Sequence, residues 1–276
     1  MKTLRFIAPL LLAFLSGAAL AQQEQLSVPV EYRGQQIQLM VMFNKPPGPG
    51  PFPLVIALHS CSAYSANMYG GALPRWVAFL RQQGYATLKI DSFTARHVSE
   101  VCRENPMTTA DRGVTLADRA ADVLAGAILL AGRPDVRAER IAAIGFSNGG
   151  GTAVYVARDY TELRLLRAQL AARGGKLVAS IGLYPICLSP EGSPVIVPLL
   201  ALSGGSDDWT PAAACAAIAN MPGNRLMAVQ VYPGAYHAFD IPGLATYKLG
   251  HRLQYDAAAT ADAYPRVQQF LARYLQ

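Results

Sequence analysis

Residues 145–150 read GFSNGG, and this short stretch decides the fold. An apolar, strand-like segment at 141–146 precedes Ser147, and a helix-compatible segment at 148–158 follows it. A serine on a sharp turn between a strand and a helix needs small neighbours, and Gly145 and Gly149 supply them. This is the G-x-S-x-G pattern of a nucleophile elbow, which lifts a serine hydroxyl to the edge of a sheet. The helix N-terminus that follows would face a developing oxyanion.

Two other interpretations of the same stretch are a capped helix after an ordinary strand and a glycine-rich phosphate loop. A phosphate loop has a lysine after its glycines. The stretch GFSNGGGTAVY contains none. We therefore interpret 145–150 as a nucleophile elbow.

Outward from the elbow, the chain alternates strand-like and helix-like segments. Apolar runs rich in Val, Ile and Leu lie at 52–58, 85–90, 141–146, 176–183, 195–202 and 226–232. Helix-compatible segments lie at 74–83, 116–131, 148–158, 161–172, 211–219 and about 260–275. Continuous apolar strands alternating with helices predict an α/β fold with a mostly parallel sheet and helices on both faces. Residues 25–46 predict an antiparallel N-terminal hairpin that turns at Arg33-Gly34.

The residues after each strand are the ones to inspect for chemistry, because open α/β sheets bind ligands beyond the carboxyl ends of their strands. In α/β-hydrolases the acid and then the histidine follow the serine in the chain. His237 lies in a turn after the last apolar run, whereas His251 has no strand before it, so we predict His237 as the base. Asp207 and Asp208 follow the run at 195–202. We predict Asp207 as its partner and Asp208 as a turn or helix-cap residue.

Five segments together resemble the dienelactone hydrolase family of α/β-hydrolases, in particular its exported members with a serine nucleophile. They are, in chain order, LHSC, DSF..R, GFSNGG, GGSDDWTPAAAC and YPGAYHAFD, and the resemblance runs from about Phe52 to Phe239. It implies an α/β-hydrolase fold and a catalytic triad of Ser147, Asp207 and His237. It also implies an oxyanion hole formed by the backbone N–H groups of Cys61 and Asn148.

Two positions depart from the family pattern. Ser147 stands where dienelactone hydrolase itself has cysteine, and His59-Ser60 stands where the family has His-Gly. We expect His59 to be structural.

The N-terminus indicates export. Lys2 and Arg5 precede an apolar run that ends in small residues, which is typical of a secretory signal peptide at 1–21 with cleavage after Ala21. A transmembrane anchor would need a longer apolar run. We expect a single domain at 22–276, located in the periplasm or secreted, with no membrane span after cleavage.

The four cysteines fit an oxidising compartment, where disulfides are the default. None lies in a CxxC pair, which disfavours a zinc site. Cys61 and Cys102 follow strands that we expect to be neighbours, and so do Cys187 and Cys215. We therefore predict the pairs Cys61–Cys102 and Cys187–Cys215.

The net charge of +6 comes from scattered residues and does not indicate a nucleic-acid partner. We expect no cofactor and no metal, and the sequence leaves the oligomeric state open.

Several side chains near the predicted site are candidates for binding substrate. Arg96 is a candidate for binding a substrate carboxylate, and the alternative is a solvated surface arginine. The alternative for each aromatic residue is an ordinary position in the core. The aromatic candidates for an acyl or aryl pocket are Tyr64, Tyr69, Phe146, Trp209, Tyr236 and Phe239.

No insertion is long enough for a large lid, and only 161–172 and 189–194 are candidates for a small cap. These features predict an open site that hydrolyses short or medium-chain esters, aryl esters or ester polymers. The alternatives are a lactone hydrolase, a serine peptidase and a noncatalytic exported binding protein on the same fold.

Overall fold

The computed structural model describes residues 22–62, 64–65, 71–103, 105, 113–188 and 193–276. The signal peptide predicted at 1–21, the candidate Tyr69 and most of the candidate cap at 189–194 lie outside these residues.

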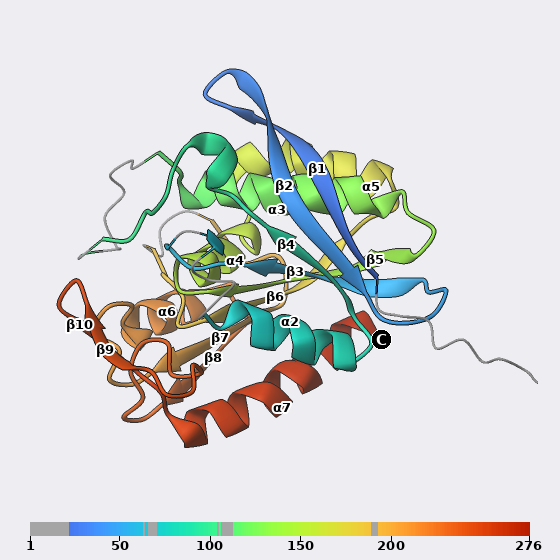
Figure 1. Cartoon of the computed structure of the whole chain (residues 1–276). Coiled ribbons are helices and arrows are strands. Elements are labelled where there is room, and N and C mark those ends of the chain that lie inside the picture. Colours follow the sequence, from blue (N-terminus) through green and yellow to red (C-terminus); the bar gives the residue numbers. More distant parts are fainter. Residues whose placement is uncertain (1–21, 63, 66–70, 104, 106–112, 189–192) are drawn as a thin grey trace, which may run out of the picture.

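An eight-stranded sheet forms the centre of the molecule, in the order β1-β2-β4-β3-β5-β6-β7-β8 (Figure 1). The six strands from β3 to β8 run parallel, and β1 and β2 add an antiparallel hairpin at one edge. The strands are β1 (Gln22–Tyr32), β2 (Gln35–Lys45), β3 (Phe52–Leu58), β4 (Ala86–Ile90), β5 (Val136–Phe146), β6 (Leu177–Leu183), β7 (Leu199–Gly204) and β8 (Met227–Tyr232). The predicted α/β fold and its N-terminal hairpin are confirmed.

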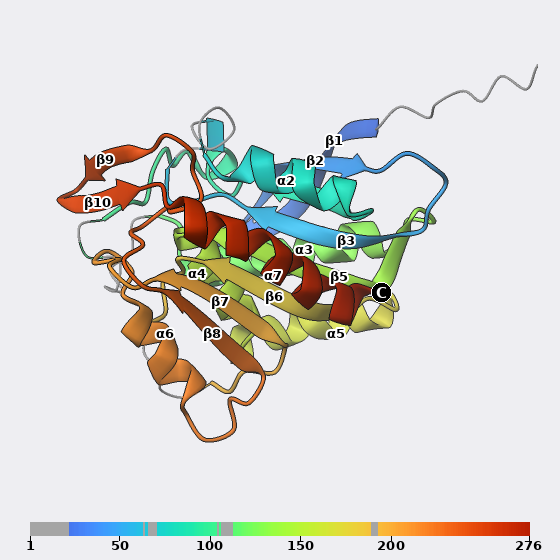
Figure 2. The same cartoon turned by 90° about the horizontal axis from the view of Figure 1, so that it is seen from below.

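Helices cover both faces of this sheet, as predicted. Helices α2 and α7 pack on one face, where the view from below shows α7 lying across the sheet (Figure 2). Helices α3, α4, α5 and α6 pack on the other face. The helices are α2 (Leu73–Gln82), α3 (Leu116–Ala131), α4 (Asn148–Val156), α5 (Arg164–Ala172), α6 (Ala212–Ala219) and α7 (Ala257–Leu275), with short 3-10 turns η1 (Thr94–Arg96) and η2 (Thr161–Leu163).

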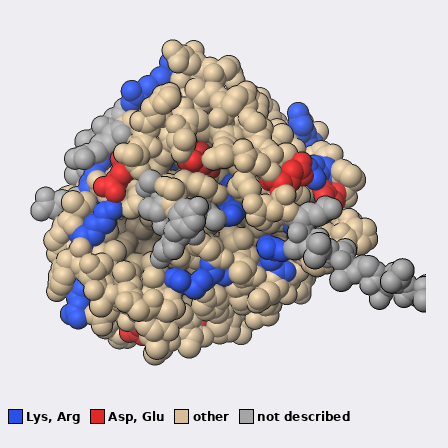
Figure 3. Space-filling model, viewed as in Figure 1, with Lys and Arg blue, Asp and Glu red and all other residues tan. Residues whose placement is uncertain are grey.

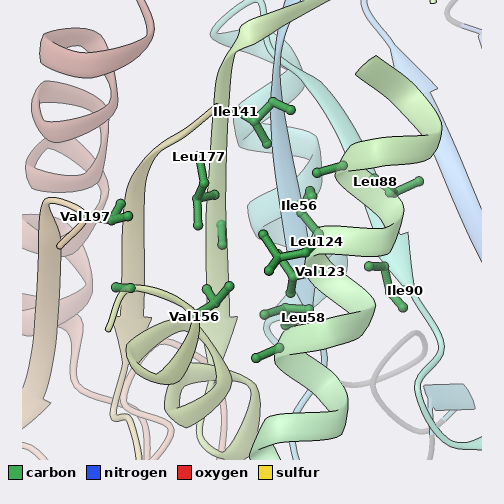
Figure 4. Packing of buried hydrophobic residues seen from close by; sticks show 14 of the residues in the cluster. Ile56, Leu58, Leu88, Ile90, Val123, Leu124, Ile141, Val156, Leu177 and Val197 are labelled. Atoms are coloured by element: carbon green, nitrogen blue, oxygen red, sulfur yellow. The ribbon is translucent and has the colours of Figure 1, made fainter. Parts of the chain in front are cut away.

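The larger core lies between the sheet and α3. Ile56 and Leu88 on the strands meet Val123 and Leu124 of the helix, and all four side chains are fully buried (Figure 4). The helix begins where Thr115 and Asp118 form a capping box, in which each side chain accepts a hydrogen bond from the backbone N–H of the other residue. Helix α3 is thereby fixed at the end that lies nearest to Ser147.

Strand β5 begins at Val136, earlier than the predicted run at 141–146, and two other segments also differ from the prediction. Strand β7 begins at Leu199 rather than at Val195, which makes only an isolated bridge with Arg158. Pro198 directly before β7 has no N–H for the ladder, which explains the late start. A second hairpin, formed by β9 (Ala245–Lys248) and β10 (His251–Gln254), was not predicted.

The segment 161–172 is not a cap over the site. It forms η2 and α5, and α5 packs against α3 on the face of the sheet. The prediction of a small cap at this position was therefore wrong.

Lys and Arg side chains are scattered over the face seen in Figure 3 rather than gathered over one element. Among the described residues, no helix is both long enough and apolar enough to cross a membrane.

Candidate active site

Ser147 lies on the sharp turn between β5 and α4. Its backbone has φ 56° and ψ −114°, a conformation that L residues rarely adopt. The turn also brings main chains into close contact, because a Cβ atom on Gly145 would overlap the carbonyl of Gly149. A Cβ atom on Gly149 would overlap the carbonyl of His59 in turn. The two glycines are therefore required by the turn that presents the Ser147 hydroxyl.

His237 lies beyond the end of β8, with its Nε2 2.9 Å from Ser147 Oγ. The imidazole is 2 % exposed, so its hydrogen bonds form away from bulk water. The hairpin that was not predicted holds the backbone at this point, because Gln254 N–H donates to the carbonyl of His237. The backbone of His237 is thus held by the hairpin, and its imidazole is held by the contact with Ser147.

Asp207 lies beyond β7, and its Oδ2 is 2.8 Å from His237 Nδ1. The backbone N–H groups of Trp209 and Thr210 donate to its Oδ1 at 3.0 and 2.9 Å. Burial alone would raise the pKa of Asp207, but the charge of His237 and the hydrogen bonds from His237 and Thr210 outweigh burial and lower the pKa. The carboxylate is therefore held ionised beside the imidazole.

Asp208, the neighbouring carboxylate, points elsewhere. Its Oδ1 is 3.3 Å from Nδ1 of His251, and its side chain is 62 % exposed. It does not cap α6, whose N-cap is Pro211 with no side-chain hydrogen bond, so the helix-cap alternative for Asp208 was wrong. The Trp209 ring stacks on His251 at 5.3 Å and lies 5.0 Å from the ring of His237. The two carboxylates therefore contact two different imidazoles.

Cys61 and Asn148, the predicted oxyanion residues, line one cavity together with Ser147. The backbone N–H of Ser147 itself donates to Leu183 O, so this N–H is not available to an oxyanion.

Arg119 on α3 connects the segments that carry these two residues, a feature that the sequence analysis missed. Its guanidinium donates to Asn148 Oδ1 and, at 2.6 Å, to the carbonyl of His59. The side chain is fully buried, which lowers its pKa to about 9, so it remains a cation at neutral pH. Nothing in the sequence distinguishes Arg119 from an exposed arginine in the first turn of a helix.

His59 has a structural position, as expected. Its Nδ1 lies 2.9 Å from Ser60 O, and its Nε2 accepts a hydrogen bond from the N–H of Ser92. Burial first, and the charge of Arg119 second, lower its pKa well below 6.5. A neutral ring with both nitrogens occupied holds the loop after β3.

The substrate-binding candidates divide into two groups. Trp209 and Phe146 line cavities next to Ser147. Tyr64 packs edge-on against His59 and lines a separate cavity, and Tyr236 lies under the guanidinium of Arg252 at 4.4 Å. Among the described residues, the cavities next to Ser147 include neither of these tyrosines.

Arg96 and Phe239 are also away from these cavities. Arg96 forms two hydrogen bonds with Asp122, at 2.8 and 2.7 Å, and its side chain is 1 % exposed. The prediction that Arg96 meets a substrate carboxylate was therefore wrong, because a buried internal carboxylate already occupies its guanidinium. Phe239 is fully buried in the core under α7.

Both predicted disulfides are confirmed. Cys61 is bonded to Cys102 and Cys187 to Cys215, with Cα–Cα distances of 4.8 and 5.1 Å. The first bond joins the loop of the candidate oxyanion hole to the segment after β4. The second joins the segment after β6 to helix α6.

The sequence profile of the dienelactone hydrolase family matches residues 42–275. No curated protein sequence matches the chain. A putative dienelactone hydrolase from Klebsiella pneumoniae has a similar structure, with a TM-score of 0.66 and 19% identity, covering 92% of this chain and all of the other.

Two further structures are similar to the same extent. A dienelactone hydrolase-like promiscuous phosphotriesterase from metagenomic libraries has a TM-score of 0.63 at 20% identity and covers 94% of this chain and 100% of its own. An esterase of Pyrococcus furiosus has a TM-score of 0.62 at 16% identity and covers 93% of this chain and 94% of its own. At these identities the likeness concerns the fold.

Proposed function

The chain belongs to the dienelactone hydrolase family, a family of hydrolases with the α/β-hydrolase fold, and from this we propose that it is a serine esterase. The observation that carries the proposal is the chain of contacts from Ser147 Oγ through the His237 imidazole to the Asp207 carboxylate, at 2.9 and 2.8 Å. A serine hydroxyl is a weak nucleophile unless a positioned base takes its proton. This arrangement supplies the base and the group that orients it.

In the first half of the reaction, Ser147 Oγ attacks the ester carbonyl carbon while its proton passes to His237 Nε2. Asp207 holds the proton on Nδ1, which leaves Nε2 free to accept, and then stabilises the imidazolium. The tetrahedral intermediate collapses when its bond to the alcohol oxygen breaks, and the alcohol leaves with the proton from His237. The product is an acyl group on Ser147.

In the second half, His237 takes a proton from water and the resulting hydroxide attacks the acyl carbon. Collapse of this intermediate returns the proton to Ser147 Oγ and releases the carboxylic acid. The negative charge on the carbonyl oxygen in both intermediates would be held by the N–H groups of Cys61 and Asn148 and by the N-terminus of α4. Arg119 supports this hole because it fixes the segments on both sides.

We also propose that the protein is exported after removal of residues 1–21. Two disulfides among the described residues support an oxidising compartment. An exported esterase would meet esters outside the cytosol, either as small molecules or as groups exposed on a polymer.

The test is labelling with a fluorophosphonate, followed by rates on p-nitrophenyl esters of increasing chain length. We expect one label, on Ser147, and hydrolysis of short and medium esters. A noncatalytic binding protein would show neither, and a peptidase would cleave peptide amides in addition to the esters, whereas we expect this protein to leave peptide amides intact.

A further inference from the structure

Two cavities meet at Ser147. The first has a volume of about 260 Å³ and lies against the start of α3, and we call it the α3 cavity. The second has a volume of about 200 Å³ and lies under the β9–β10 hairpin, and we call it the hairpin cavity. They share the walls formed by Cys61, Ser147 and Trp209, and the rest of their described linings differ. A substrate that reacts at Ser147 can therefore extend in two directions.

His237 lines the hairpin cavity and is not among the residues that line the α3 cavity. An ester has two sides, and only one of them must receive a proton from His237 for the reaction to proceed. This is the alcohol side, whose oxygen must come within hydrogen-bond distance of Nε2. The acyl side remains attached to Ser147 and extends away from the imidazole.

We propose that the α3 cavity binds the acyl group of the substrate and that the hairpin cavity binds the alcohol group. The assignment rests on the proposed esterase function, since it follows from the direction in which His237 must deliver its proton. It extends the proposed function because it assigns one cavity to the acyl group of the ester and the other cavity to the alcohol group.

The walls of the α3 cavity select an apolar acyl group. Beyond the reacting residues, polar or aromatic side chains in its lining are those of Arg103, Thr115, Tyr155, Trp209 and Thr210. Apart from Cys102, the other walls are aliphatic, and they are Val101, Val114, Leu116, Ala117, Ile186 and Leu188. Each methylene that an acyl chain buries here is worth about fourfold in binding at full burial. The cavity therefore favours medium-length or branched aliphatic acids over acetate.

The walls of the hairpin cavity select an uncharged ring. The rings of Phe146, Tyr184 and Trp209 form part of its lining, and Ile241 and Leu253 add aliphatic surface. Aromatic walls of this kind bind a flat ring through stacked or edge-on contacts.

The cation at the edge of the hairpin cavity is already paired. Lys248 Nζ donates to Ser62 Oγ at 2.9 Å and to Glu100 at 2.8 Å. This neutralisation disfavours an anionic alcohol. The substrate class is therefore an ester of an apolar carboxylic acid with an aryl or ring-bearing alcohol.

Two pairs of esters test the two cavities separately. The first pair, p-nitrophenyl octanoate and p-nitrophenyl acetate, differs only in the acyl group. The second pair, 2-phenylethyl butyrate and ethyl butyrate, differs in the ring on the alcohol. For each pair the measured quantity is the ratio of kcat/KM for the larger ester to that for the smaller one.

Leu116→Trp narrows the α3 cavity and Ile241→Trp narrows the hairpin cavity, and both side chains are only half-buried in the protein. We expect Leu116→Trp to lower the acyl ratio about tenfold or more by the loss of several buried methylenes, with the alcohol ratio close to that of the wild type. Ile241→Trp should lower the alcohol ratio and leave the acyl ratio close to that of the wild type. Leu165→Trp, at a site 69% exposed on α5, is the control and should change neither ratio.

The opposite pattern, or a fall of both ratios in each variant, overturns the assignment while the esterase function stands. Hydrolysis of none of the four esters, together with no fluorophosphonate label on Ser147, overturns the proposed function and the assignment with it. If a tryptophan variant fails to fold, as judged by its thermal unfolding, Leu116→Phe and Ile241→Phe make the same comparison with a smaller ring.

Discussion

Asp207 Oδ2 lies 2.8 Å from His237 Nδ1, while the adjacent carboxylate of Asp208 faces a different histidine. Asp207→Asn should lower kcat by about 10⁴-fold, because an amide no longer holds the proton on Nδ1. Asp208→Asn makes the same chemical change one residue away, and kcat should stay within about threefold of the wild type, since an exposed polar contact contributes little. Equal losses in the two variants would contradict the assignment of Asp207 as the partner of His237.

Ser147→Ala tests the nucleophile. We expect ester hydrolysis to fall by about 10⁴-fold or more, because the remaining groups can only bind substrate and stabilise an oxyanion. Labelling by a fluorophosphonate should disappear, whereas the thermal unfolding temperature should change little. A label that persists on another residue would show that the nucleophile is elsewhere.

Arg119→Met tests the support of the oxyanion hole. The change leaves Asn148 Oδ1 and the His59 carbonyl without the guanidinium, so the two segments lose their common anchor. The expected loss is about 10²-fold in kcat with a smaller change in KM, since misplaced oxyanion donors weaken transition-state binding.

The matched control for Arg119 is Arg167→Met. Arg167 also donates to two backbone carbonyls, those of Val156 and Arg158, but at the far end of α4 from Ser147. It should lower stability and leave kcat nearly unchanged. If both variants lost stability and kcat in parallel, Arg119 would have a purely structural role.

The two disulfides should differ in their effect on activity. Replacing both members of either pair by alanine should cost about 2–4 kcal/mol of unfolding free energy. Loss of Cys61–Cys102 should also lower kcat, because Cys61 is in the proposed oxyanion loop. Loss of Cys187–Cys215 should change mainly the denaturant midpoint, which urea unfolding and steady-state rates would measure together.

His59 should make stability depend on pH. Its pKa is lowered in the native protein, by burial first, so below about pH 6.5 the unfolded chain binds a proton that the native protein excludes. Native stability therefore falls as pH decreases, by up to about 1.4 kcal/mol per pH unit. Urea unfolding at pH 7 and pH 5 should show that the wild type loses about 1–2 kcal/mol more than His59→Gln. An equal loss in both proteins would mean that His59 takes up its proton in the native state.

The sequence was sufficient to predict those elements and residues that a local pattern or the order along the chain identifies. The turn at Arg33-Gly34 was recognised because long strands of alternating apolar residues flank it. Leu249-Gly250 makes the same kind of turn, with positive φ at both residues, and its hairpin was missed. The strands beside it have four residues each and few apolar side chains, so no alternation marks them.

The side-chain partners of the buried arginines were beyond prediction. Arg96 pairs with Asp122, 26 residues further along the chain, and Arg119 reaches Asn148, 29 residues away. Such contacts depend on how α3 lies against the sheet, and the sequence pattern of a helix does not show this. That Ser147, His237 and Asp207 lie together could be predicted, because each follows a recognisable strand and all such ends meet at one edge.

The two disulfides join cysteines that are consecutive in the chain, the first with the second and the third with the fourth. In the export proposed above, a chain that crosses the membrane from its N-terminus would expose Cys61 and Cys102 before either of the other two. An oxidant that acts on cysteines as they appear would make the native pairs directly, with no wrong pair to rearrange. The connectivity is therefore compatible with the proposed export, in which the chain would be oxidised while it is still crossing the membrane.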